Sequence, residues 1–151
     1  GFRTREELQK TESKRLFSPD YQHKFRISKL TTNKTSAACL ETVLATIGIE
    51  QSQEYLAQLI GPYERAKDIL FVAHKIGLRG KKQIIPSVKG LNKFQKQFVL
   101  IDLAKPHQAP QYSLVQKITK DHIFLVDNQR QEITKHSHSE LTNKQAIVLS
   151  E

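Results

Sequence analysis

The chain has 151 residues, of which 38% are hydrophobic and 26% are charged, and it carries a net charge of +9. These values are typical of one globular domain and exclude a chain that is disordered throughout. No apolar run approaches the roughly 20 residues that a membrane-spanning helix needs, and the polar N-terminus lacks the pattern of a signal peptide. The single cysteine, Cys39, excludes an internal disulfide and a multi-cysteine zinc site.

The charge points to an anionic partner. Lysine and arginine number 24 against 15 aspartates and glutamates, which favours nucleic acid, anionic lipid or an acidic polypeptide. The basic residues around 79–89 are not interleaved with aromatic residues, and no nucleic-acid-binding motif is present. We therefore do not expect nucleic acid as the partner.

The first 30 residues differ in composition from the rest of the chain. They are polar and basic, and we predict an N-terminal extension or linker over 1–30, followed by one domain over 31–151. Thr4 and Glu7 have capping-box spacing, which predicts a short helix over 5–15. Alternation of residue types over 24–28 predicts a short edge strand.

Residues 31–94 have mainly helical patterns. Apolar residues between 37 and 47 recur at helical spacing, and Gly48 ends this helix. Two further helices are predicted over 52–60 and 63–75. A strand over 82–85 and a short helix over 88–94 follow.

Residues 95–151 change to strand patterns. A buried strand is predicted over 98–103, and segments 112–118 and 122–126 have the spacing of a hairpin. Shorter strands are predicted over 132–134 and 146–149. Helices first and antiparallel strands second predict an α+β fold.

Few side chains in the sequence have the pattern of a reactive or metal-binding site. Cys39 lies about one turn inside an apolar helical pattern, so we expect a buried, inert thiol rather than a nucleophile at a helix N-terminus. His136 and His138 would share one face of a strand and could hold a metal, but no third ligand has matching spacing. We expect a solvated turn there, with no metal and no cofactor.

Two segments resemble the peptidase C39 family, whose number is unrelated to Cys39. Its members are papain-like domains at the N-terminus of bacterial ABC exporters, and the active members cleave leader peptides after a double glycine. Segment 35–48 resembles the family's first helix, which begins with the nucleophilic cysteine, and Thr35 takes that position. Cys39 takes a position one turn later, where the family tolerates cysteine or alanine.

Segment 111–128 is similar to the strands that carry the family's histidine and aspartate. Gln111 takes the histidine position, or Tyr112 does if the register slips by one residue. Asp127 takes the aspartate position, and Lys29 takes that of the glutamine that stabilises the oxyanion. The resemblance implies a papain-like cysteine-peptidase fold, with a helical N-terminal half packed on an antiparallel sheet from the C-terminal half.

The departures from the family pattern decide what activity we expect. Peptide cleavage needs a thiolate, a base beside it and an oxyanion donor. Thr35 is a poor nucleophile, Gln111 cannot deprotonate it, and Asp127 has no imidazole to orient. We therefore expect that the chain is not an enzyme.

The family has a non-catalytic branch in type I secretion exporters such as hemolysin transporters, and the chain is similar to it. The resemblance implies a domain at the cytoplasmic face of the bacterial inner membrane. Such a domain would accompany transmembrane and nucleotide-binding domains and would bind an unfolded, acidic secreted polypeptide or its leader. We expect the docking surface at Thr35, Gln111, Tyr112 and Lys34.

Two alternatives stay open. One is an active cysteine peptidase that processes double-glycine leaders with Cys39 as nucleophile and His107 or His122 as base. The other is a basic interaction domain for another protein or for nucleic acid.

Overall fold

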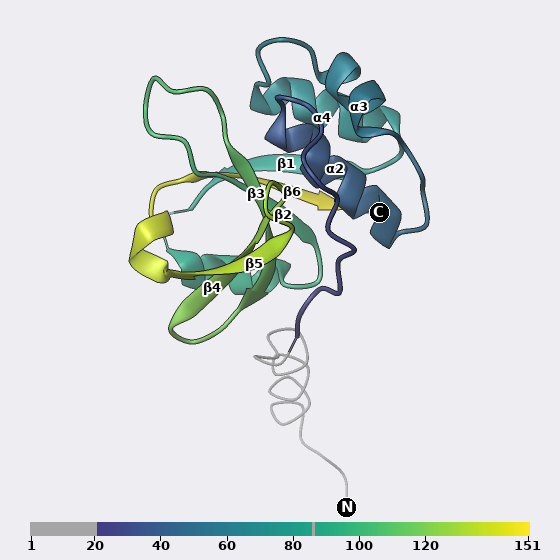
Figure 1. The fold of residues 1–151 in the computed structure, drawn as a ribbon. Coiled ribbons are helices and arrows are strands. Elements are labelled where there is room, and N and C mark those ends of the chain that lie inside the picture. Colours follow the sequence, from purple (N-terminus) through teal and green to yellow (C-terminus); the bar gives the residue numbers. More distant parts are fainter. Residues whose placement is uncertain (1–20, 86) are drawn as a thin grey trace, which may run out of the picture.

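The computed structural model describes residues 21–85 and 87–151. Helices come first along this part of the chain and strands follow (Figure 1). The α-helices are α2 (Thr35–Thr46), α3 (Gln53–Ile60) and α4 (Ala66–Lys75). The strands are β1 (Arg79–Ile84), β2 (Phe98–Asp102), β3 (Tyr112–Ile118), β4 (His122–Asp127), β5 (Glu132–Ser137) and β6 (Gln145–Ser150). Two 3₁₀ segments, η1 (Val88–Phe94) and η2 (His138–Leu141), lie between strands.

The strands form one antiparallel sheet in the order β1-β6-β2-β3-β4-β5. The last strand of the chain, β6, lies between β1 and β2, so β1 and β5 are the two edges. Figure 1 shows the three helices gathered on one side of the molecule, beside β1, β2, β3 and β6. This arrangement confirms the predicted α+β fold class, with a helical first half and a sheet from the second half.

The hydrophobic core has two parts, one on each face of the sheet. Phe98 and Leu100 of β2 pack with the helices, whereas Val99 and Ile101 pack in a second cluster on the other face. Because successive side chains of a strand point to opposite faces, a strand covered on both faces is apolar throughout. This burial on both faces explains why the sequence predicts a strand over 98–103.

The structure moves the start of one predicted helix and the start of one predicted strand. The third helix begins at Ala66 rather than at residue 63, because Asp68 accepts a hydrogen bond from the backbone N–H of Arg65 and stabilises the helix start there. The strand predicted over 82–85 begins at Arg79, and the whole of β1 pairs with β6. The residues of β1 are mostly exposed and basic, and apolar and polar residues do not alternate along it. The sequence therefore did not indicate the first half of this strand.

Residues 21–30 pack along the domain without forming the predicted edge strand. Only an isolated bridge joins Gln22 to Lys117. The His23 ring packs against both Phe25 and Phe98, which also contact each other, and its Nε2 lies 2.8 Å from the Gln97 carbonyl oxygen. The helix predicted over 5–15 lies outside the described residues, and the domain boundary at residue 30 stays a prediction. Within 21–85 and 87–151, no helix is long and apolar enough to cross a membrane.

Candidate functional site

A cavity of about 230 Å³ lies at the N-terminus of α2. Its wall comes from the start of α2, the start of β3, the turn after β4, and β5. Thr35, Gln111, Tyr112 and Asp127 all line it, although up to 92 positions separate them in sequence. The structure thus brings together four of the six residues to which the sequence analysis assigned a position in the site.

Thr35 is the first residue of α2 and ties this helix to the sheet. Its hydroxyl oxygen accepts a hydrogen bond of 2.8 Å from the backbone N–H of Tyr112, at the start of β3. The Tyr112 side chain is buried, and this burial raises the pKa of its phenol, with the negative charges of Asp102 and Glu64 adding to the shift. The hydroxyl oxygen of Thr35 therefore accepts a hydrogen bond that joins α2 to β3 at the cavity wall.

Asp127 and Gln111 reach the cavity from the ends of neighbouring strands. The Oδ1 atom of Asp127 accepts hydrogen bonds from the backbone N–H groups of Gln129 (2.9 Å) and Arg130 (3.1 Å), which stabilises the β4–β5 turn. Gln111 is exposed, and its backbone N–H donates to Asp102 Oδ1 at 3.0 Å. Its side chain makes no hydrogen bond among the described residues, so it is free to contact a ligand.

Lys29 and Lys34 do not line this cavity. Lys29 lines a different hollow of about 620 Å³ beside α2 and α3. Lys34 precedes α2 as its N-cap residue, and its Nζ donates to Asn33 Oδ1 at 3.4 Å. Neither lysine therefore lines the cavity that the other four predicted site residues share.

The thiol of Cys39 is completely buried, which confirms the expectation of a buried cysteine. Its Sγ lies 3.6 Å from the Tyr112 carbonyl oxygen and 3.7 Å from Asn128 Oδ1. Burial raises the pKa of this thiol, and the negative charge of Glu64 raises it further. Neither His107, in an exposed loop, nor His122, on β4, is among its hydrogen-bond partners.

Glu64 is a buried carboxylate that the sequence analysis did not identify. Its Oε1 accepts hydrogen bonds from the backbone N–H (2.9 Å) and the hydroxyl (2.6 Å) of Ser36. A negative charge at a helix N-terminus is stabilising, because the first N–H groups of the helix have no partner within it. Glu64 lies between two helices in sequence, so no local pattern connected it with α2.

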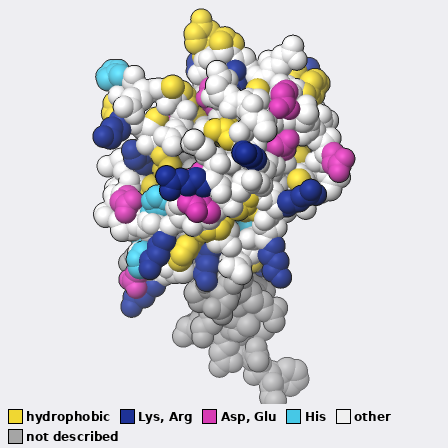
Figure 2. Space-filling model, viewed as in Figure 1, with side chains coloured by type: hydrophobic (Ala, Val, Ile, Leu, Met, Phe, Trp, Pro, Cys, Tyr) yellow, Lys and Arg dark blue, Asp and Glu magenta, His cyan; other side chains and the backbone are white. Residues whose placement is uncertain are grey.

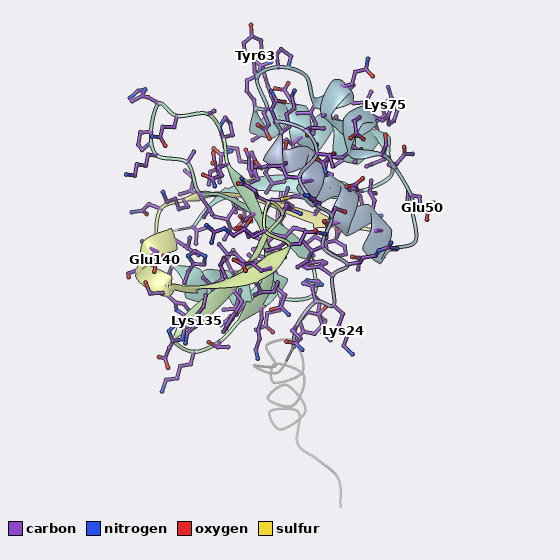
Figure 3. All side chains as sticks on the ribbon, viewed as in Figure 1. Lys24, Glu50, Tyr63, Lys75, Lys135 and Glu140 are labelled. Carbon is purple, nitrogen blue, oxygen red and sulfur yellow. The ribbon has the colours of Figure 1, made fainter. Side chains whose placement is uncertain are left out.

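The prediction for His136 and His138 also needs correction. The expected solvated turn is wrong, because β5 continues to Ser137 and His138 begins η2. The half-buried imidazole of His136 lines the cavity, with Nδ1 3.1 Å from Glu140 Oε2 and Nε2 2.8 Å from Thr134 Oγ1. Figure 3 shows Glu140 on the side of the molecule opposite Lys75, the last residue of α4.

The fold is that of peptidase domains from ABC transporters. A double-glycine-motif protease from an AMS/PCAT transporter, solved in complex with the leader peptide, has a TM-score of 0.70 at 14% identity, over 86% of this chain and 94% of that one. The peptidase domain of Streptococcus ComA, a bifunctional ABC transporter of a quorum-sensing pathway, has a TM-score of 0.67 at 21% identity, over 85% and 98%. The peptidase domain of Streptococcus mutans ComA has a TM-score of 0.59 at 16% identity, over 83% and 99%.

No protein-family model and no curated protein matches the sequence. The structural likeness bears out the resemblance to double-glycine peptidase domains that segments 35–48 and 111–128 indicated. It also corrects the expectation that the chain is not an enzyme, because the three solved domains named above are peptidase domains and one of them is a double-glycine-motif protease. The residues at Thr35, Gln111 and Lys29 depart from a family pattern, and that departure is no ground for excluding peptidase activity.

Proposed function

We propose that this chain is the peptidase-like domain of a bacterial ABC exporter and binds the exported polypeptide at the N-terminus of α2. The observation that carries the proposal is the meeting of Thr35, Gln111, Tyr112 and Asp127 at one cavity. In the proposed setting the domain lies at the cytoplasmic face of the inner membrane, beside the transporter's transmembrane and nucleotide-binding domains. Binding is the step that precedes any cleavage of a bound peptide.

The lining of the cavity fits a short stretch of polypeptide backbone. The side chains of Gln111, Ser113 and Asp127 offer hydrogen-bonding groups, and those of Leu30 and Leu103 offer apolar surface. A volume of about 230 Å³ is smaller than the roughly 300–1,000 Å³ of pockets for drug-sized ligands. Residues with small side chains, such as the glycines at the end of a double-glycine leader, suit a cavity of this size.

The charge of the chain supports an acidic partner. A net charge of +9 favours association with an unfolded acidic polypeptide, because unlike charges steer the encounter. Figure 2 shows lysine and arginine side chains spread over the visible face, with acidic side chains between them. The basic surface would attract the exported polypeptide, and the cavity would hold one segment of it.

The test measures the affinity of a double-glycine leader peptide for two matched variants. Gln111→Trp places an indole at the cavity, whereas Gln108→Trp places the same group on the same exposed loop but outside the cavity lining. We expect Gln111→Trp to weaken binding about tenfold or more, a loss of about 1.4 kcal/mol, and Gln108→Trp to leave it unchanged. Mass spectrometry of the peptide in the same samples records whether it is cleaved.

Equal affinities of the two tryptophan variants and the unmodified chain would contradict the proposal. An absence of binding to both a leader peptide and an unfolded acidic polypeptide would also contradict it. Near-identical amide spectra of the variants control for misfolding, since both substituted side chains are exposed.

A further inference from the structure

Strand β1 forms an exposed edge of the sheet. It pairs with β6 on one side, and no other strand of the described chain pairs with its outer side. Five of its six residues are exposed. In Figure 1, β1 lies beside β6 and below α4. An edge strand presents unpaired backbone N–H and C=O groups, which another extended chain can bind.

Basic side chains lie along this edge, on both of its faces. Arg79 and Lys81 share one face of the strand and Lys82 lies on the other, because successive side chains alternate. The strand contains no acidic residue, and none of the three takes part in an ion pair with a described residue. The Nζ atoms of Lys81 and Lys93 lie 4.6 and 5.0 Å from the centroid of the Phe94 ring, which adds a further cation beside the strand.

Packing holds β1 firmly against the body of the domain. A Cβ atom on Gly80 would lie 2.6 Å from a methyl carbon of Leu70 and 2.7 Å from one of Leu149, so any larger residue there would have to displace these two side chains. The inner side of β1 is fixed by this contact and by its pairing with β6. The outer edge of β1 is therefore already in extended form, with its backbone groups on the unpaired side.

We propose that the outer edge of β1 binds an extended segment of an acidic polypeptide as an added strand. The backbone groups would supply affinity, and acidic side chains on either face of the added strand would meet Arg79, Lys81 and Lys82. A second copy of this chain does not fit, because two such edges would bring like charges together. A nucleic acid lacks the peptide groups that the edge requires.

This surface is separate from the cavity at α2. The cavity is bounded by β3, β4 and β5, whereas β1 is the opposite edge of the sheet. The inference does not depend on the function proposed for the cavity. The two can fail independently, since Gln111→Trp alters only the cavity and leaves the edge of β1 intact.

The test uses the whole chain and a peptide of glutamate, threonine and valine without a double glycine. We expect Arg79→Glu with Lys82→Glu to weaken binding about tenfold or more, and Lys120→Glu with Lys135→Glu, the same change of charge elsewhere, to alter it less than about twofold. Methylation of alternate peptide nitrogens should weaken binding about tenfold, because it removes backbone donors and leaves the peptide's charge unchanged. Amide exchange along β1 should slow when the unmodified peptide binds.

Four results would each overturn the inference. One is an equal loss of affinity in both pairs of glutamate variants, which would indicate non-specific attraction of an anion. The second is equal binding of the methylated peptide, and the third is equal binding of a single-stranded oligonucleotide of equal charge. The fourth is no binding at all. The substituted residues are exposed, and a well-dispersed amide spectrum verifies that each variant folds.

Discussion

At the residue scale, Glu64 is a buried side chain that stabilises the start of α2. It is 6% exposed, and its carboxylate accepts both hydrogen bonds that Ser36 offers. A buried donor left without a partner costs more than the bond itself contributes, because the donor has also lost its water. The stability of the cavity wall should therefore be sensitive to this position.

We expect Glu64→Ala to lower the free energy of unfolding by about 2 kcal/mol more than Glu64→Gln does. Glutamine keeps an acceptor oxygen, and both variants share the cost of a non-glycine residue at a φ of 50°. Denaturant unfolding of the two variants measures the difference. Equal stabilities would show that the contacts with Ser36 contribute nothing.

Cys39 makes a pH-dependent contribution to stability. Its pKa is raised in the folded protein, first by burial, so the folded state keeps the proton that the unfolded thiol loses above a pH of about 8.5. Stability from this group is complete below that pH and is lost as the pH rises. The free energy of unfolding should fall more steeply above a pH of about 8.5 in the unmodified chain than in Cys39→Ala.

Denaturant unfolding on both sides of that pH measures this slope for both proteins, and alkylation provides a second measurement. In the folded protein the thiol should react with iodoacetamide far more slowly than in the unfolded protein. Equal slopes in the two proteins, or alkylation as fast as in the unfolded chain, would contradict the description of Cys39 as buried and protonated.

Sequence reasoning found some residues of the cavity and missed others for a physical reason. Thr35, Gln111 and Asp127 lie in short segments that resemble the peptidase family, and the resemblance assigns each of them a position in the site. His136 lines the cavity, and Glu64 binds Ser36 beside it, through contacts that no local pattern contains. Lys29 and Lys34 are close to Thr35 in sequence, but Lys29 lines a different hollow and neither lysine lines the cavity.

At the element scale, residues 21–30 are held by the aromatic stack around His23. The stack and the contact with the Gln97 carbonyl explain how a segment without a regular strand stays packed on the domain. Burial lowers the pKa of His23 against the opposing effect of its backbone hydrogen bonds, so the neutral imidazole is the folded form.

Acid should therefore weaken the packing of this segment. In the unfolded chain, this histidine takes up a proton below a pH of about 6.5. In the folded protein, His23 has a lower pKa and stays neutral to a lower pH. The free energy of unfolding therefore falls as the pH falls below about 6.5. His23→Phe should show a flatter dependence between a pH of about 7 and about 5 than the unmodified chain. His74→Phe, at the exposed end of α4, is the control, and an equal effect of both substitutions would contradict this account.

Helices and strands were predictable from the sequence where burial imposes a regular spacing of apolar residues. They were less predictable where an element is exposed. The hairpin of β3 and β4 was found because its side chains enter the two parts of the core. The first half of β1 was missed, because an exposed edge strand needs no apolar residues. The edge strand expected over 24–28 does not form, because side-chain packing of His23 and Phe25 holds that segment instead.

At the scale of the whole molecule, the fold and the charge have separate consequences. The fold brings the ends of β3 and β4 to the start of α2 and so creates the cavity. The excess of basic residues acts over the surface and at the edge of β1. The order of helices and strands made the fold class predictable, whereas the insertion of β6 between β1 and β2 could not be deduced from local patterns.

The most direct test of the central claim is a map of amide chemical shifts while a double-glycine leader peptide is added to the isotope-labelled chain. The account predicts that the largest changes fall on Thr35, on Gln111 to Ser113 and on the turn after Asp127, the backbone around the cavity. Changes confined to other parts of the described chain, such as β1 or α3, would contradict the claim that the N-terminus of α2 is the binding site. So would an unchanged spectrum at a saturating peptide concentration.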